Sequence, residues 1–234
     1  MSVPPQGPAS LMVPDCLRAE STDCMLPSLQ SEDLSYIKDA GWARVGIVAA
    51  VMDERHHLLM LKHKQSAKTT EGMLGPLAET AQVTKANGNI NIETTAHTLS
   101  RAVFEELGVI EPSTLELRAR RVGAWTINRW PVGVNHDGQI GLAVCPVVHI
   151  GSGEREMLMD TFSETEEITA IDFMDMEDVA AERLVRPGTH AWLHDIVASN
   201  LHSVPVTERE PIDFPDPSPL QGAVDIKFKD IDYL

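Results

Sequence analysis

The stretch from Glu93 to Val109, ETTAHTLSRAVFEELGV, decides how the rest of the chain is interpreted. It predicts a helix that begins after a run of threonines and ends at Gly108, a residue suited to the left-handed turn that closes helices. Its apolar residues recur at three- and four-residue spacing and predict one buried face, which consists of Ala96, Leu99, Val103 and Leu107. We therefore expect this helix to pack on a core.

Three charged residues of the helix lie off this apolar face. Arg101 and Glu105 are four residues apart, so we expect them to pair on the helix surface, which adds only about a few tenths of a kcal/mol. Glu105 and Glu106 are adjacent, and stability does not explain two like charges side by side. Neighbouring carboxylates suit a hard divalent cation, which prefers oxygen ligands and leaves positions for phosphate oxygens and water.

The spacing of these residues resembles the Nudix box, whose consensus is G-x5-E-x7-R-E-U-x-E-E-x-G-U with U a bulky aliphatic residue. The matching positions are Glu93, Arg101, Val103, Glu105, Glu106, Gly108 and Val109. Five fixed polar and glycine positions coincide by chance roughly once per million starting points at average residue usage. Two positions depart from the consensus. Ala102 stands where the family has a glutamate, and Asn87 stands where it has the first glycine.

The resemblance implies an α/β fold, namely an α/β/α sandwich with a mixed central β-sheet and the box as a loop-helix-loop. It also implies a hydrolase that uses Mg²⁺ or Mn²⁺ to cleave a diphosphate linkage in a small nucleotide-like molecule. In such a site Glu105 and Glu106 bind the metal ion, and Arg101 orients the carboxylates through Glu93. A homodimer would also be in keeping with the family.

Further site residues follow from the same resemblance. Glu93 itself is a candidate metal ligand. The segment from Gly75 to Glu79, GPLAE, looks like a degraded form of the family's Pro-Gly-Gly, which makes the carbonyl of Gly75 another candidate ligand. Family members often place an extra metal-binding or proton-accepting carboxylate shortly before the last strand. If Phe173 fills that strand's aromatic position, Glu167 is this carboxylate.

Two other readings of the chain remain open. The first is an ordinary amphipathic helix with a solvated acidic end, without Nudix ancestry. The second is a catalytically weak or inactive Nudix-like domain that binds a ligand or a protein partner. Ala102, the degraded Pro-Gly-Gly and the extra residues before Glu93 favour this second reading. The retained carboxylate pair favours the hydrolase, because a pure scaffold does not need it.

Composition limits the classes of function. The chain has 234 residues with 43% hydrophobic and 23% charged residues, as an ordinary globular protein has. Its formal net charge of -16 argues against nucleic-acid binding, which needs a basic face. Three cysteines without metal-site spacing fit reduced thiols in a cytosol, and the first fifteen residues resemble neither a signal peptide nor a membrane anchor. We expect a soluble, cytoplasmic protein without a membrane partner.

Proline content divides the chain into an extended arm at 1–30, a Nudix-like domain at 31–204 and a tail at 205–234, which either folds back or pairs with another subunit. Strands are predicted at 42–52, 56–64, 113–125 and 138–150, and those at 42–52 and 56–64 form a hairpin by their spacing. Helices are predicted at 31–41, 93–107 and 191–201. The segment 168–179 looks like the last strand of the Nudix fold followed by the start of its closing helix. Loops or turns are predicted at 87–88, at 125–138 with Trp125 and Trp130, and at the acidic segment 152–167.

Overall fold

Strand β1 (Arg44–Met52) lies at the centre of the fold, and its near-continuous apolar sequence explains this position. Side chains alternate between the two faces of a strand, so a strand that is apolar throughout is suited to burial on both faces. Ile47 and Val51 enter a hydrophobic cluster on one face. Val48 and Met52 enter a second cluster on the other face. The strand predicted at 42–52 is confirmed as β1.

The computed structural model describes residues 31–39, 44–64, 72–86, 89–112, 115, 118–120, 128–131, 140–144, 146–186, 188–198, 209–212 and 214–227. The predicted arm at 1–30 lies outside these residues. Within the described part of the chain, no helix is long and apolar enough to cross a membrane.

The main sheet is built around β1 and the hairpin partner predicted for it, β2 (Leu58–His63). Its other strands are β3 (Leu74–Gly75), β4 (Leu77–Thr80), β7 (Arg118–Arg120), β8 (Asn128–Pro131), β9 (Ile140–Val144), β10 (Val147–His149), β11 (Ile168–Met174) and β12 (Arg209–Pro211). The strand order is β11-β2-β1-β10-β7-β12, with β3 beside β2, β4 and β9 beside β1, and β8 beside β9. Because β1 pairs parallel with β9 and β10 but antiparallel with β2 and β4, the sheet is mixed, as predicted.

Two sequence predictions in this sheet are wrong in detail. The sequence predicts one strand over 138–150, but the structure has β9 and β10, which pair with successive parts of β1. Pro146 precedes β10 and lacks the N–H that a continuous ladder requires, while its carbonyl accepts a hydrogen bond from the Ala50 N–H at 2.8 Å. The predicted loop at 125–138 contains strand β8, which pairs with β9. Trp125 in this loop lies outside the described residues.

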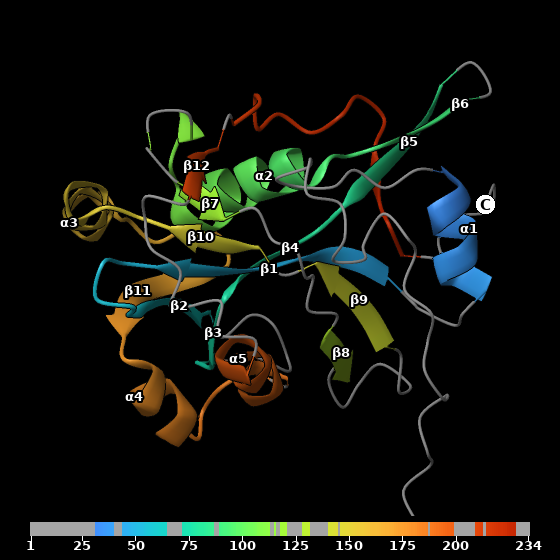
Figure 1. The fold of residues 1–234 in the computed structure, drawn as a ribbon. Coiled ribbons are helices and arrows are strands. Elements are labelled where there is room, and N and C mark those ends of the chain that lie inside the picture. The colour runs from blue at the N-terminus through green and yellow to red at the C-terminus, as the bar shows by residue number, and fades with distance from the viewer. Residues whose placement is uncertain are drawn as a thin grey trace, which may run out of the picture.

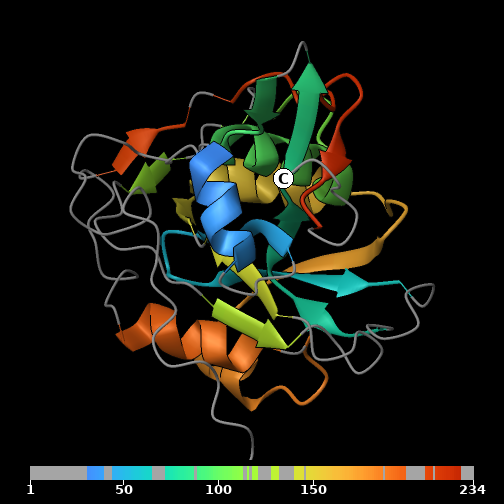
Figure 2. The same ribbon diagram turned by 90° about the vertical axis from the view of Figure 1, so that its right-hand side faces the viewer.

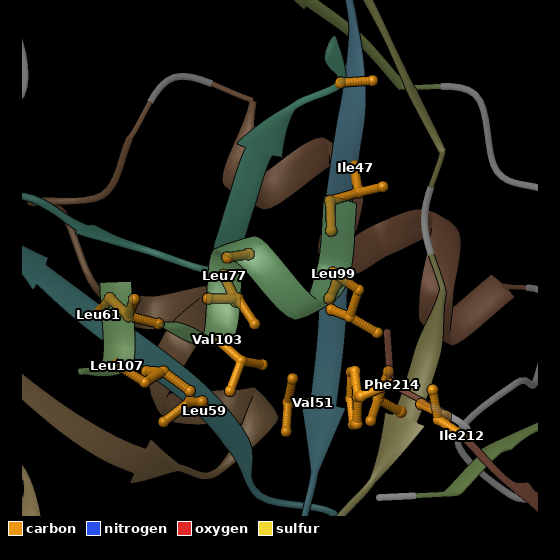
Figure 3. Packing of buried hydrophobic residues seen from close by; sticks show 14 of the residues in the cluster. Ile47, Val51, Leu59, Leu61, Leu77, Leu99, Val103, Leu107, Ile212 and Phe214 are labelled. Carbon is orange, nitrogen blue, oxygen red and sulfur yellow. The ribbon is translucent and has the colours of Figure 1, made fainter. Parts of the chain in front are cut away.

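Helices cover both faces of the sheet, which confirms the predicted α/β/α sandwich (Figure 1). Helix α2 (Thr95–Leu107) packs on one face, whereas α4 (Met176–Ala181) and α5 (Thr189–Ala198) pack on the other, and the view turned by 90° shows the same separation (Figure 2). Leu99 and Val103 of α2 meet Val51 and Leu77 of the sheet (Figure 3). Trp192 of α5 is buried in the opposite cluster.

Helix α2 has the ends that the sequence predicts. The Thr94 side chain accepts a hydrogen bond from the His97 N–H at 3.1 Å and caps the first turn. Gly108 ends the helix at a φ of 70°, where a residue with a Cβ would be strained. The buried face differs from the prediction at two positions. Ala96 is only half-buried, and Ala102, which was not predicted to be buried, is fully buried.

Helix α3 (Ser152–Thr161) occupies a segment for which the sequence predicts a loop, so that prediction is wrong. The prediction relied on acidic composition, but Glu, Met, Leu and Arg all have high intrinsic helix propensity. Glu154 lies in the first turn, where a negative charge is favourable, and Leu158 is buried in the same cluster as α2. One apolar anchor and good propensity are sufficient for this helix.

The residues inserted before Glu93 form a hairpin of β5 (Gln82–Ala86) and β6 (Asn89–Ile92), joined by two residues at the predicted turn. Strand β13 (Val224–Asp225) pairs with β5, so these strands form a second sheet with the order β13-β5-β6. The turn residues themselves lie outside the described part of the chain.

The described part of the predicted tail folds back onto the domain. Strand β12 pairs with β7, and Ile212 and Phe214 enter the core beside Leu99 (Figure 3). The Ser100 hydroxyl donates a hydrogen bond to the Pro215 carbonyl at 2.7 Å, which fixes the returning chain along α2. The described residues of 205–234 therefore share one core with the predicted domain.

The helices predicted at the two ends of the domain are confirmed. Helix α1 (Ser31–Asp39) buries Leu34 and Ile37 in the same cluster as α2. The predicted last strand and closing helix are β11 and α4, and the helix predicted near the end of the domain is α5.

Leu99→Ala is expected to lower the free energy of unfolding by about 2–5 kcal/mol, because it leaves a cavity between α2 and β1. Urea denaturation followed by circular dichroism measures this loss. Ile110→Ala is the matched control, since Ile110 is 78% exposed and its truncation should change the free energy by less than about 0.5 kcal/mol. Equal losses in the two variants would contradict the packing described for α2.

Candidate functional site

Arg101 lies inside the protein, with its side chain only 2% exposed, which corrects the predicted surface pair. Its Nε donates a hydrogen bond to Glu93 Oε1 at 2.9 Å, and Nη2 donates to the Thr80 carbonyl at 2.6 Å. Nη1 donates to Glu105 Oε1 at 3.3 Å. Burial alone lowers the pKa of Arg101, but the hydrogen bond to Glu93 and the nearby carboxylates raise it above its usual value. The guanidinium therefore stays charged and joins three segments.

Glu93 is the partner that holds Arg101 in place. Its Oε2 accepts hydrogen bonds from the Gln82 N–H at 2.9 Å and from the Thr98 hydroxyl at 3.0 Å, and it also faces Arg101 Nη2 at 3.3 Å. The Glu93 N–H donates to the Gln82 carbonyl at 2.8 Å and closes the base of the β5–β6 hairpin. The inserted residues thus leave Glu93 in contact with Arg101. Direct metal binding by Glu93 stays a prediction and would compete with these bonds.

The adjacent residues Glu105 and Glu106 have different surroundings. Consecutive side chains on a helix point in different directions, so the two carboxylates need not share an environment. The Glu105 side chain is 40% exposed and faces Arg101. Glu106 is only 5% exposed, and its Oε2 accepts a hydrogen bond from the Ala78 N–H of β4 at 3.3 Å. Of the predicted carboxylate pair, Glu106 is therefore the buried member.

The surroundings of Glu106 disfavour its ionised form. Burial raises its pKa well above the usual value, and the negative charges of Glu79 and Glu167 raise it further. The positive charge of Arg186 and the hydrogen bond from Ala78 act in the opposite direction. These four groups come from β4, from the start of β11 and from the segment after α4, so the fold gathers them around one carboxylate.

Glu79 forms an acidic cluster with Glu106 and Glu167, although its place in the sequence predicts no role for it. Burial raises its pKa to about 7, despite the opposing charge of Arg101, whose Nη2 lies 3.6 Å from Glu79 Oε1. The negative charge of Glu105 also raises this pKa. Glu79 of β4 is two residues from Leu77 in the same strand and two residues from Ala81, which follows the strand, and both of these apolar residues are buried. A glutamate on an apolar face of a strand was the sequence signal that could have identified it.

The structure brings two further predicted residues to this region. The Glu167 carbonyl accepts a hydrogen bond from the Lys64 N–H at 2.7 Å, which joins the start of β11 to the end of β2. Gly75, in strand β3, pairs with Leu61 of β2 and lies three residues before Ala78 along the chain. Of the predicted residues, Glu167 is close enough to Glu106 for its charge to act on that carboxyl group, Gly75 lies beside His63, and Glu93 and Glu105 contact Arg101.

Arg186 and His63 are also part of the site, and sequence spacing gave no signal for either. Arg186 Nη1 donates a hydrogen bond to His63 Nε2 at 3.3 Å. Burial, assisted by the charge of Arg186, lowers the pKa of His63 to about 4, so this histidine is neutral near pH 7 and its Nε2 accepts the bond. Arg186 follows α4 and reaches the site only through the tertiary fold.

Ala102, the departure from the Nudix box, is fully buried in the hydrophobic cluster that includes Leu99 and Val103. A glutamate at this position would place a carboxylate against apolar side chains, which is costly unless a cation or hydrogen bonds compensate. Ala102 therefore contributes to core packing. Glu79 is the carboxylate that the structure offers near Glu106 instead.

The donor set fits a divalent cation in its chemistry. Among the described residues, no three His, Cys, Asp or Glu side chains gather as a closed metal-binding group. Mg²⁺ is commonly held by only one or two carboxylates, with water and substrate phosphates completing its shell. Glu106 and Glu79 provide two such carboxylates, and a bound cation would favour the ionised form of both. The residues therefore fit one divalent cation whose remaining ligands come from water or from a bound molecule.

No protein-family model matches the chain, and no curated protein sequence matches it. Its structure is similar to that of the MutT protein from Methanosarcina mazei Go1, with a TM-score of 0.45 and 11% identity over 67% of this chain and 94% of that one. It is also similar to RenU, a Nudix hydrolase from M. smegmatis, with a TM-score of 0.46 and 12% identity over 71% of this chain and 89% of that one.

A third similar structure is the E. coli dihydroneopterin triphosphate pyrophosphohydrolase, with a TM-score of 0.39 and 13% identity over 68% of this chain and 98% of that one. With TM-scores below 0.5 and identities of 11–13%, none of these likenesses decides the fold or the function of this chain, so both have to be argued from its own residues.

Arg101→Met is expected to lower the free energy of unfolding by about 3–5 kcal/mol, because it leaves the buried Glu93 carboxylate without its cation. Urea denaturation at pH 7 measures the loss, with Arg183→Met on the exposed surface as the control. The double variant with Glu93→Gln should lose less than the sum of the two single variants. Strictly additive losses would show that the two side chains do not act as a pair.

Glu79→Gln is expected to become progressively more stable relative to the wild type as the pH rises from about 4.5 to about 7. The folded state raises the pKa of Glu79 from 4.5 to about 7, so within this window the folded protein binds more protons than the unfolded chain and loses stability as pH increases. His63 acts in the opposite direction, because its folded pKa of about 4 is below its usual 6.5.

The measurement is therefore the difference in unfolding free energy between the wild type and Glu79→Gln at several pH values, without divalent metal. The contribution of His63 is common to both proteins and cancels in this difference. A difference that is independent of pH would show that Glu79 titrates as an ordinary exposed carboxylate.

Proposed function

We propose that this protein is a divalent-metal-dependent hydrolase of the Nudix type, which uses Mg²⁺ or Mn²⁺ to cleave a diphosphate linkage in a nucleoside-diphosphate-type small molecule. The observation that supports the proposal is the burial of the Glu106 carboxyl group, which accepts a hydrogen bond from the Ala78 N–H and lies within reach of the charge of Glu79. Perturbed carboxylates of this kind occur mainly at functional sites. The resemblance of α2 to the Nudix box supplies the class of reaction.

The energetic cost of this cluster is the physical argument for function. Glu106 could be replaced by an apolar side chain at the end of the α2 face, and the protein would avoid burying a carboxyl group. Arg101 is engaged by Glu93, Glu105 and the Thr80 carbonyl, so it only partly compensates Glu79. A divalent cation from solution would compensate both buried carboxylates.

Each residue of the site has a role in this proposal. Glu106 and Glu79 would hold the cation. Arg101 of α2, bonded to Glu93 and to the Thr80 carbonyl of β4, would hold the helix and the strand in fixed positions around it. Glu167 is exposed and near Glu106, so it is the candidate to accept a proton from the attacking water. When bound, the metal ion supplies neutralisation of the diphosphate charge and acidifies that water.

A second candidate function is a catalytically weak or inactive domain that binds a phosphate ligand or a protein partner. The burial of Ala102 in the core favours it, because a box carboxylate has been exchanged for apolar packing. Loss of one acidic group at such a site lowers the charge available to a metal ion. If the lost group was the general base, the rate falls by a factor on the order of 10²–10⁴.

Calorimetric titration of Mn²⁺ and Mg²⁺ into the chelator-stripped protein tests the proposed site. We expect micromolar to low-millimolar binding that weakens by at least about tenfold in Glu106→Gln, because the variant lacks the central carboxylate. Glu156→Gln, on the exposed side of α3, is the matched control and should bind metal as the wild type does. If the wild type binds no metal ion, or if Glu106→Gln binds it with unchanged affinity, the proposal of a metal-dependent hydrolase is overturned.

A panel of nucleoside diphosphate compounds, assayed for phosphate or nucleotide products, then separates the two candidates. Hydrolysis that is lost in Glu106→Gln supports the enzyme. Metal binding without hydrolysis of any member of the panel favours the binding domain.

A further inference from the structure

Arg186 is held at the acidic cluster by the backbone on both sides of it. Its N–H donates a hydrogen bond to the Leu74 carbonyl at 2.7 Å, and the Leu74 N–H donates to the Leu184 carbonyl at 2.9 Å. Val185 forms an isolated parallel bridge with Leu74. The segment after α4 is therefore fixed along β3, and the direction in which Arg186 leaves the backbone is set.

Gly75 provides the space that the Arg186 side chain occupies. A Cβ at this position would collide with Cδ of Arg186 and would lie 3.3 Å from His63 Nε2. The guanidinium extends past Gly75 to His63, to which Nη1 donates at 3.3 Å. A glycine, a neutral buried histidine and two backbone hydrogen bonds thus fix the position of one cation.

The same chain continues from Gly75 to Ala78, whose N–H binds the Glu106 carboxylate at 3.3 Å. Arg186 is half-buried, so part of its side chain remains accessible, and its charge acts on Glu106. Arg186 therefore places a positive charge in the surroundings of Glu106 at a position that solvent partly reaches.

We propose that Arg186 is the residue that binds a phosphate group of the substrate, with Gly75 and His63 positioning its guanidinium. A cluster of glutamates repels a diphosphate, and a guanidinium presents paired N–H donors that match phosphate oxygens. Arg186 thereby selects for substrates with a phosphate group next to the metal site. This inference rests on the proposed function, since it takes a metal-bound diphosphate as the ligand.

The test uses the full-length protein, Mg²⁺ and imidodiphosphate, a pyrophosphate analogue that resists hydrolysis. Calorimetry measures the affinity for Mg²⁺ alone and then for imidodiphosphate at saturating Mg²⁺. In Arg186→Met we expect at least a tenfold loss of imidodiphosphate affinity, with Mg²⁺ affinity equal or higher because a repelling cation is gone. Arg186→Lys should lose less, since it keeps the charge but not the paired donors.

Two more variants separate positioning from charge and from general damage. Gly75→Ala should weaken imidodiphosphate binding although Arg186 is intact, because the new Cβ displaces its side chain. Arg183→Met, an exposed arginine of the same segment, should bind both ligands as the wild type does. Urea denaturation verifies that each variant is folded under the conditions of the titration.

The outcomes distinguish this inference from the proposed function. If the wild type binds both ligands and Arg186→Met binds imidodiphosphate with unchanged affinity, the proposed role of Arg186 is overturned. The proposed metal site is not affected by this result. If Arg186→Met loses affinity for Mg²⁺ and for imidodiphosphate equally, the role of Arg186 is also overturned, because a phosphate-binding residue is not needed to bind the metal ion alone. Failure of the wild type to bind Mg²⁺ overturns the proposed function and this inference together.

Discussion

The buried guanidinium of Arg101 is the constraint on which the rest of the site depends. It bonds to the end of β4 through the Thr80 carbonyl, to the base of the β5–β6 hairpin through Glu93 and to its own helix through Glu105. A charge at this depth is tolerated because nearly all of its donors have acceptors. Because Arg101 joins three segments, it fixes the position of α2 relative to β4. The positions of Glu106 on α2 and Glu79 on β4 follow from this.

The acidic groups themselves are arranged at a cost to stability. Glu79 and Glu106 are carboxyl groups whose burial favours the neutral form, and the negative charge of Glu79 raises the pKa of Glu106 further. The positive charge of Arg101 partly stabilises the ionised form of Glu79, and that of Arg186 partly stabilises the ionised form of Glu106. A cluster that opposes folding in the absence of metal and is compensated by a cation is consistent with a site that recruits a metal ion together with a phosphate compound.

Local sequence patterns predicted the elements whose signals are periodic or depend on single residues. The apolar run of β1, the hairpin to β2 and the ends of α2 at Thr94 and Gly108 all follow from such signals. Errors occurred where composition was used alone, as in the acidic helix α3, or where one residue divides a pattern, as Pro146 does before β10. The return of the tail to β7 had no local signal, because the partner strand lies far along the chain.

For the site, the sequence by itself determined the identity and spacing of the α2 residues, and with them the resemblance to the Nudix box and the prediction of a carboxylate site. Tertiary structure alone decided which of those carboxylates are buried. It separated Glu105 from Glu106, moved Arg101 from the predicted surface into the interior, and added Glu79 and Arg186. The physical reason is that burial and charge depend on groups brought together from distant segments, whereas spacing along one helix fixes only the direction of each side chain.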